Sequence, residues 1–200
     1  MVFDLASHVR RPNLTPMNLR FKETKTTQAA ARLLELRGGQ MSYMKLIKLL
    51  YILDREALTR WGRPITGDRY VSMDRGPVLS RTYNLIIDEP APNEDTAWSH
   101  HISKPQNYEV KLSQPAPNDE LSEAESALIE EVFAKYGQMT RWALVDLVHG
   151  FPEWRNPEGS AVAITYRDIL KATGKTDLEI ASILQELEDV ALADALLPAR

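Results

Sequence analysis

Residues 43–61 read YMKLIKLLYILDREALTRW, and this stretch decides the fold. Its apolar residues recur at the spacing of one helical face, and further apolar residues beside them leave few positions for water. A helix that is apolar over most of its circumference belongs inside a bundle. We therefore predict a central buried helix over residues 43–61, with Ser42 as its N-cap and Gly62 after its last residue.

Asp54 lies on the apolar face of this helix, because it continues the helical spacing of Ile47, Leu50 and Leu58. A buried carboxylate without a partner is very costly. Asp54 is therefore expected to meet a cation or several hydrogen-bond donors. The cations proposed for it come from the segment that follows: Arg69, Arg75 and Arg81.

The connector after the helix reads WGRPITGDRYVSMDRGPV and covers residues 61–78. Arginine and aromatic side chains on a rigid loop are good anchors for a protein partner. The alternative is that the same side chains only hold the loop to the core. We assign structural roles to Asp54, Gly67, Gly76 and Pro77, with Pro77 as the first residue of a helix. Partner contacts are predicted for Tyr51, Arg55, Trp61, Arg63, Asp68, Tyr70, Met73 and Arg75.

Start and stop signals predict six further helices, over residues 28–37, 77–87, 123–136, 141–149, 166–173 and 177–197. Three of them begin with the spacing of a capping box. Strands are predicted at residues 70–73 and in a hairpin of residues 98–102 with 108–112. The fold class is mainly α, a compact bundle of about seven helices with a small β-hairpin. Residues 1–22 are expected to be an extension and residues 23–200 a single globular domain.

Composition excludes several classes of protein. The chain has no cysteine, so disulfides and cysteine-ligated metal sites are ruled out. No apolar run has the length of a membrane span, and residues 1–11 do not have the pattern of a secretory signal. We therefore expect a cytoplasmic protein that does not enter a membrane.

Charge is divided unevenly along the chain. Residues 1–75 hold 14 Lys and Arg against 7 Asp and Glu, whereas residues 76–200 hold 10 against 21. This division indicates either an acidic partner for the first part or pairing of the two parts inside one fold. Nucleic-acid binding is not favoured, because no basic recognition helix or RNA-binding pattern is present.

Catalytic and metal-binding patterns are missing from the sequence. The four histidines do not have metal-ligand spacing, and no phosphate loop or nucleophile elbow occurs. Asp146 and His149 could form an oriented base, but a histidine at a helix C-terminus is more often satisfied structurally. The acidic residues of 119–131 are read as the solvated face of a helix. We predict no catalytic residue, no metal and no cofactor.

Three ordered motifs carry a resemblance to a known family. They are KLIKLLYILDRE at residues 45–56, GRPITGDRY at residues 62–70 and RGPV at residues 75–78. Together they closely resemble the Panacea antitoxin domain, formerly described as phage-associated and SocA-like. A weaker likeness extends the match to roughly residues 28–172. Ala57 departs from the family, which often has histidine there.

The resemblance implies an antitoxin that neutralises a cognate protein toxin by direct contact in a toxin–antitoxin system. Neither the toxin nor the oligomeric state follows from it. The alternative is a phage or mobile-element adaptor that delivers a partner to a protease, or a regulator associated with DNA. A hydrolase using Asp146 and His149 is the third reading. Residues 1–22 and the terminal helix are expected to help choose the partner, although core packing is the simpler role for that helix.

Overall fold

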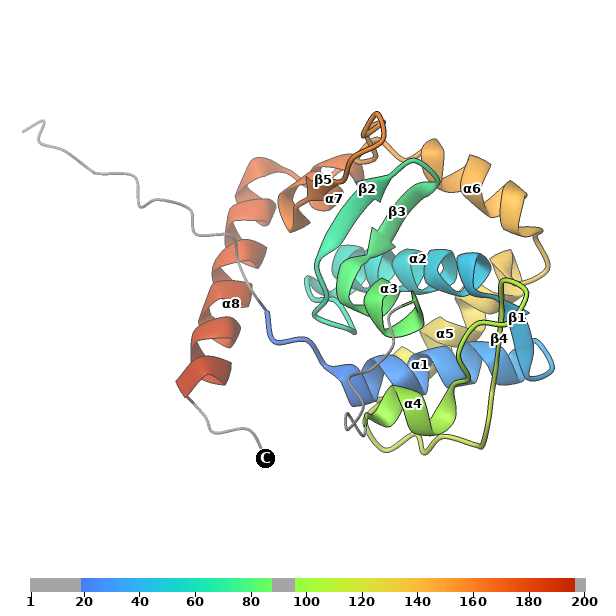
Figure 1. Cartoon of the computed structure of the whole chain (residues 1–200). Helices are drawn as coiled ribbons and strands as arrows, with labels where there is room; N and C mark the ends of the chain where they lie inside the picture. Colours follow the sequence, from blue (N-terminus) through green and yellow to red (C-terminus); the bar gives the residue numbers. More distant parts are fainter. Residues whose placement is uncertain (1–18, 88–95, 197–200) are drawn as a thin grey trace, which may run out of the picture.

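The computed structural model describes residues 19–87 and 96–196, which contain eight helices and five short strands (Figure 1). The fold is mainly α, as predicted. The helix beyond the expected seven is the short α4. The elements are α1 Glu23–Leu36, β1 Gln40–Ser42, α2 Tyr43–Trp61, β2 Tyr70–Met73, β3 Gly76–Leu79, α3 Ser80–Ile87, α4 Ala97–His101, β4 Glu109–Lys111, α5 Glu123–Tyr136, α6 Arg141–His149, β5 Val162–Ile164, α7 Tyr166–Ala172 and α8 Asp177–Leu196.

Helix α2 lies at the centre of the molecule, as its apolar circumference predicts (Figure 1). Every residue from Lys45 to Asp54 is buried, and α1, α5, α6, α7 and β3 pack around the helix. The helix ends at Gly62, which has a φ of 70° and donates its N–H to the carbonyl oxygen of Leu58 at 3.0 Å. Glycine favours this left-handed conformation because it has no Cβ.

Helix α1 begins at Glu23, five residues before the predicted start at Gln28. The sequence pattern predicts that Thr26 and Thr27 precede the helix. Both are instead buried inside it, and the hydroxyl of Thr26 donates backwards to the carbonyl oxygen of Lys22 at 2.8 Å. A threonine hydroxyl can make either kind of bond, so the residue type alone does not mark the first turn.

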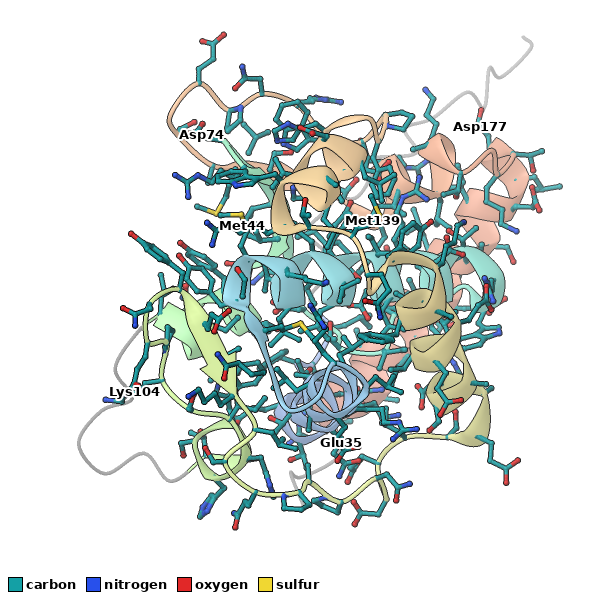
Figure 2. The ribbon with its side chains drawn as sticks, turned by 90° about the vertical axis from the view of Figure 1, so that its right-hand side faces the viewer. Glu35, Met44, Asp74, Lys104, Met139 and Asp177 are labelled. Atoms are coloured by element: carbon teal, nitrogen blue, oxygen red, sulfur yellow. The ribbon has the colours of Figure 1, made fainter. Side chains whose placement is uncertain are left out.

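Strands β3, β2 and β5 form an antiparallel sheet in that order. The prediction of a strand at residues 70–73 is confirmed, but the prediction of Pro77 as the first residue of a helix is wrong. Pro77 lies in β3 opposite Ser72, and α3 begins only at Ser80. Proline is tolerated there because β3 is an edge strand and needs no ladder N–H on its outer side. Figure 2 shows Asp74, in the β2–β3 turn, at the same edge of the molecule as Met44 in the first turn of α2.

The predicted hairpin of residues 98–102 with 108–112 is also wrong. Residues 97–101 form α4, which begins with a capping box between Thr96 and Ser99. The strand β4 pairs with β1 instead, with Val110 opposite Met41. Only a bridge between Ile102 and Leu112 joins the two segments of the expected hairpin. The capping box explains the helix, because it satisfies orphan backbone donors at the N-terminus.

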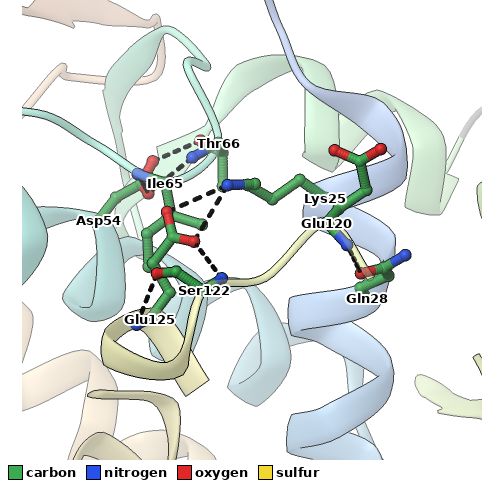
Figure 3. Close-up of polar contacts among 8 residues, drawn as sticks. All are labelled: Lys25, Gln28, Asp54, Ile65, Thr66, Glu120, Ser122 and Glu125. Carbon is green, nitrogen blue, oxygen red and sulfur yellow. Dashed lines mark hydrogen bonds and ion pairs between the residues drawn. The ribbon is translucent and has the colours of Figure 1, made fainter. Parts of the chain in front are cut away.

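Ion pairs join the basic first part of the chain to the acidic second part. Lys25 of α1 contacts Glu125 of α5 at 3.0 Å (Figure 3), and two arginines pair with the next acidic residues of α5. These are Arg32 with Glu130 at 2.7 Å and Arg60 with Glu131 at 2.6 Å. Glu125 of the acidic run is thus mostly buried against α1, whereas Glu130 and Glu131 remain on the solvated face, where exposed ion pairs contribute little to stability.

Helix α8 lies along the outside of the molecule (Figure 1). Ile180 and Leu187 are buried, whereas Leu192 and Leu196 are 61% and 77% exposed. The first part of the helix therefore packs against the core, which is the simpler of the two roles expected for it. Its last turns do not pack in this way. No helix in the described residues has the length and apolarity of a membrane span. Of the predicted extension, residues 1–18 lie outside the described residues, and the N–H of Lys22 donates to the carbonyl oxygen of Thr66 at 2.9 Å.

Candidate functional site

Asp54 fixes the beginning of the connector to the central helix. Its carboxylate accepts hydrogen bonds from the N–H groups of Ile65, at 2.8 Å, and Thr66, at 3.0 Å (Figure 3). The hydroxyl of Thr66 and that of Tyr70 donate to its other oxygen. No arginine pairs with it in the described part of the chain, so several donors, rather than a cation, satisfy this buried group. Complete burial raises the pKa of Asp54 to about 6, although these hydrogen bonds act to lower it.

Asp68 fixes the connector a second time, at the first turn of α3. Its carboxylate accepts from the N–H of Arg81 at 3.0 Å and from both the N–H and the hydroxyl of Thr82 at 2.8 Å. Asp68 is 1% exposed. We expected Asp68 at the partner surface, but its oxygens satisfy donors inside the protein.

Tyr51 and Tyr70 are also buried, so they do not form part of a contact surface in this structure. Their rings meet edge to face with centroids 5.6 Å apart. The hydroxyl of Tyr51 donates to Glu153 at 3.0 Å, and Arg55 donates to the same carboxylate at 2.6 Å. The guanidinium of Arg55 also lies 4.2 Å from the ring centroid of Phe151. These contacts hold α2 to the segment after α6 and leave Arg55 only partly exposed.

The connector returns to the beginning of α2 through the β2–β3 turn. Gly76 has a φ of 91°, and a Cβ on it would lie 2.6 Å from Cγ2 of Val148. Only glycine fits this close approach without strain. Gly67 has a comparable role where the connector packs against Arg20. Its φ is 64°, and a Cβ on it would meet the carbonyl oxygen of Arg20.

Apart from the half-buried Arg55, the predicted partner residues that remain outside the core lie at the two ends of α2. Trp61, which is 37% exposed, and Arg63 lie at its C-terminal end. Met73 and Arg75 belong to the β2–β3 region near its N-terminal end. A helix of this length separates its ends by roughly 27 Å. The two pairs therefore belong to different surfaces.

Two adjoining hollows, of about 260 and 250 Å³, lie at the N-terminal end of α2 and share Tyr43, Met44 and Arg75 in their walls. Tyr108 and Trp142 border the second hollow and are 66% and 51% exposed. We call the residues around this second hollow the aromatic–arginine surface. Ser42 also lines the hollow, but the name covers only its other members, which are Tyr43, Met44, Arg75, Tyr108, Arg141 and Trp142.

Ring contacts organise the aromatic–arginine surface. The guanidinium groups of Arg75 and Arg141 lie 5.7 and 5.4 Å from the ring centroid of Trp142, within the range of cation–π attraction. The rings of Tyr43 and Tyr108 have centroids 6.3 Å apart. Tyr108 has a φ of 65°, a rare conformation for an aromatic residue. Asn107 has a φ of 52°, and the two residues form the tight turn between Gln106 and Glu109, which exchange backbone hydrogen bonds.

A family model described as Antitoxin SocA-like, Panacea domain, matches residues 46–155. The match covers more than half of the chain. The chain belongs to this family. The resemblance that the sequence motifs carry is thereby confirmed, and membership supports an antitoxin role. No curated protein and no solved structure matches the chain.

The matched part of this Panacea domain contains most of the candidate site. Four members of the surface lie inside the match: Arg75, Tyr108, Arg141 and Trp142. The other two, Tyr43 and Met44, lie just before it. Helices α1, α7 and α8 lie outside the match. The family model therefore covers the connector and most of the aromatic–arginine surface, but not the terminal helix.

His149 of the Panacea domain packs its ring against a neighbouring aromatic side chain, and its Nε2 is buried without a hydrogen-bond partner among the described residues. Its ring stacks on Trp154 with centroids 4.0 Å apart and an angle of 21° between the planes. Burial lowers its pKa, and the nearby Lys48 acts in the same direction. Asp146 is exposed to solvent. Within the described residues, no group of three or more acidic or histidine side chains is placed to hold a metal.

Of the six members of the aromatic–arginine surface, only Arg75 is among the residues predicted from the sequence to contact a partner. One signal was available for Trp142, which stands outside the apolar stripe of α6 formed by Leu144, Val145 and Val148. A tryptophan outside the buried face of a helix is a candidate contact residue. The pairing of Tyr108 with Tyr43 gave no local signal, because the two residues are far apart in the sequence.

Proposed function

We propose that this Panacea domain neutralises a cognate protein toxin by binding it directly through the aromatic–arginine surface. Two exposed aromatic rings and two arginines gather there around a hollow. Tyrosine, tryptophan and arginine are the residue types that most often dominate binding energy in protein interfaces. This composition, on a member of an antitoxin family, is the observation that carries the proposal.

The arginines of this surface support the choice. Most basic residues of α1 and α2 that lie near α5 have carboxylate partners, but Arg75 and Arg141 form no ion pair within the described residues. Both instead contact the face of Trp142. A guanidinium that keeps its donors available can pair with carboxylates or carbonyl groups of a partner.

The surface is also held in place before binding. Met44 belongs to the first turns of the buried helix α2, and Arg75 lies in a turn bordered by the crowded Gly76. A rigid contact surface loses less conformational entropy on association than a mobile one. The deep anchoring of the connector by Asp54 and Asp68 thus serves the surface indirectly.

Co-expression with the product of the adjacent reading frame tests the proposal. The wild-type chain should rescue growth from a toxic product and co-purify with it. The double variant Arg75→Ala/Trp142→Ala should lose both properties while retaining its circular dichroism spectrum and melting temperature. A double variant that still rescues growth and co-purifies would exclude this surface as the binding site.

The adaptor reading has one supporting observation. An adaptor needs a second contact surface, and α8 exposes Leu178, Val190, Leu192 and Leu196 on a helix that carries no lysine or arginine. If the protein delivers its partner to a protease, the partner's half-life in cells should shorten when both are expressed. Simple sequestration instead lengthens that half-life or leaves it unchanged. The hydrolase reading would require His149→Ala to abolish growth rescue without unfolding the protein.

A further inference from the structure

Lys48 is an unusual residue for the interior of a bundle. It lies on α2, is 1% exposed, and donates from Nζ to the carbonyl oxygen of Pro77 at 2.7 Å. A lysine ammonium has three donors, and this carbonyl is its only hydrogen-bond acceptor among the described residues. Burial lowers the pKa of Lys48 to about 7. Burial of the charged ammonium group at this position therefore costs free energy unless an anion binds next to it.

Lys48 borders the larger of the two hollows, which has a volume of about 260 Å³. Tyr43, Met44 and Arg75 belong to the same wall and also to the aromatic–arginine surface. The hollow thus combines an apolar wall with a buried cation and a second cation at its rim. It continues the proposed partner surface inwards.

Gly76 brings the backbone close to the ammonium group. A Cβ at this position would lie 3.3 Å from Nζ of Lys48 and 3.3 Å from Cδ2 of His149. Asp74 is the acidic residue in the wall of the hollow, and one of its carboxylate oxygens accepts from the N–H of Gly159 at 3.0 Å. No ion pair between Asp74 and Lys48 occurs among the described residues. The other charged and titratable side chains that line the hollow are Asp74, Arg75, Tyr43 and Tyr83, and His149 interacts electrostatically with Lys48 from α6.

We propose that this hollow receives an aspartate or glutamate side chain of the partner toxin, whose carboxylate accepts hydrogen bonds from Lys48 and Arg75. This inference rests on the proposed function, because the hollow shares its wall with the aromatic–arginine surface. Two cations and one carboxylate line the hollow, so their net charge suits a monoanion better than a dianionic phosphate. The apolar parts of Met44 and Met73 suit the methylene groups of an acidic side chain.

The proposal predicts an affinity that depends on pH. The carboxylate binds the protonated form of Lys48, so the free protein must take up a proton whenever Lys48 is neutral. Affinity should therefore fall by up to about tenfold per pH unit above about pH 7. Burial lowers the pKa of His149 from its ordinary value, which moves its own titration away from this pH range.

The experiment measures the dissociation constant of the complex with the toxin at several pH values between about 6.5 and 8.5. Lys48→Met should weaken binding about tenfold or more at neutral pH and remove the pH dependence. Lys48→Arg should keep a charge and show no loss of affinity above neutral pH. The matched control is Lys45→Met, because Lys45 is also buried but donates to the carbonyl oxygens of Gly137 and Met139, away from the hollow. Lys45→Met should change the melting temperature and leave the dissociation constant as it is.

The outcomes separate this inference from the proposed function. If Lys48→Met binds like the wild type and the wild-type affinity does not change with pH, the acidic side chain is excluded. Loss of binding in Trp142→Ala would then still support the surface. Sodium acetate and sodium phosphate are the probes for a free anion. A free anion is the better assignment if either salt raises the melting temperature of the wild type but not of Lys48→Met, while toxin affinity is unaffected by that substitution.

Discussion

Nε of Arg55 donates to Oε1 of Glu153 at 2.6 Å, which joins the central helix to a residue 98 positions later in the chain. The side chain of Glu153 is completely buried and also accepts from Tyr51. We expect Arg55→Met to destabilise the fold by about 2–3 kcal/mol, because it leaves a buried carboxylate without its cation. Urea denaturation of the single variants and of Arg55→Met/Glu153→Gln gives the coupling energy.

The coupling energy in this cycle should be about 1–3 kcal/mol. A value within error of zero would show that packing on Phe151, rather than the ion pair, holds this part of α2. Glu56, the next residue of α2, provides the control, because its partner Arg60 is substantially exposed and such pairs contribute little.

Asp54 predicts a pH dependence of stability. Burial raises its pKa from an ordinary value of 3.8 to about 6, so the folded state binds the proton more tightly between these values. The contribution of Asp54 to the free energy of unfolding is therefore largest below about pH 4 and declines as the pH rises through about 6. The difference in stability between wild type and Asp54→Asn, followed by urea denaturation, should change over this interval and level off above it. A constant difference would contradict the raised pKa.

Asp54→Ala should be more harmful than Asp54→Asn. Alanine leaves the N–H groups of Ile65 and Thr66 without an acceptor, and we expect a loss of about 3 kcal/mol in the free energy of unfolding. Asparagine keeps one oxygen for these two donors. Equal losses for the two substitutions would mean that these backbone bonds do not stabilise the connector.

Gly76 and Gly39 form a matched pair for testing steric crowding. Their φ angles are 91° and 88°, but a Cβ on Gly39 would meet nothing within 4 Å. Alanine at either position has the cost of a left-handed conformation, about 1 kcal/mol. Gly76→Ala should lose at least about 1 kcal/mol more, because its Cβ overlaps Val148. Equal losses in thermal denaturation would show that the β2–β3 turn can move away from α6.

Most of the helices were predictable because their signals are local, although α4 was read as a strand and α1 and α3 begin elsewhere than predicted. The capping boxes of Ser122 with Glu125 and Thr165 with Asp168 are present as the spacing indicated, and α2 shows the burial that its apolar pattern required. The strands were less accessible to sequence reasoning. Which strand pairs with β4 depends on the position of β1, about 70 residues away, and no local pattern encodes it.

The candidate site was predicted only in part for the same reason. The aromatic and arginine-rich composition of the connector is evident from the sequence, but the burial of each side chain depends on its hydrogen-bond partners in three dimensions. Asp68 accepts from internal donors at the start of α3. The hydroxyls of Tyr51 and Tyr70 instead donate to buried carboxylates, so all three residues are absent from the surface. Trp142 lies next to Arg75 because α6 packs beside β3, and this packing cannot be read from the local sequence.

The most direct test of the account is the dissociation constant of the purified complex between this protein and its toxin, measured by calorimetry for Trp142→Ala. The matched control is Leu178→Ala on α8, because Leu178 is 82% exposed and lies outside the aromatic–arginine surface. We predict at least about a thirtyfold weakening for Trp142→Ala, equivalent to about 2 kcal/mol, and no change for Leu178→Ala. Unchanged affinity for Trp142→Ala, with weakened binding for Leu178→Ala, would contradict the account and place the contact on the terminal helix.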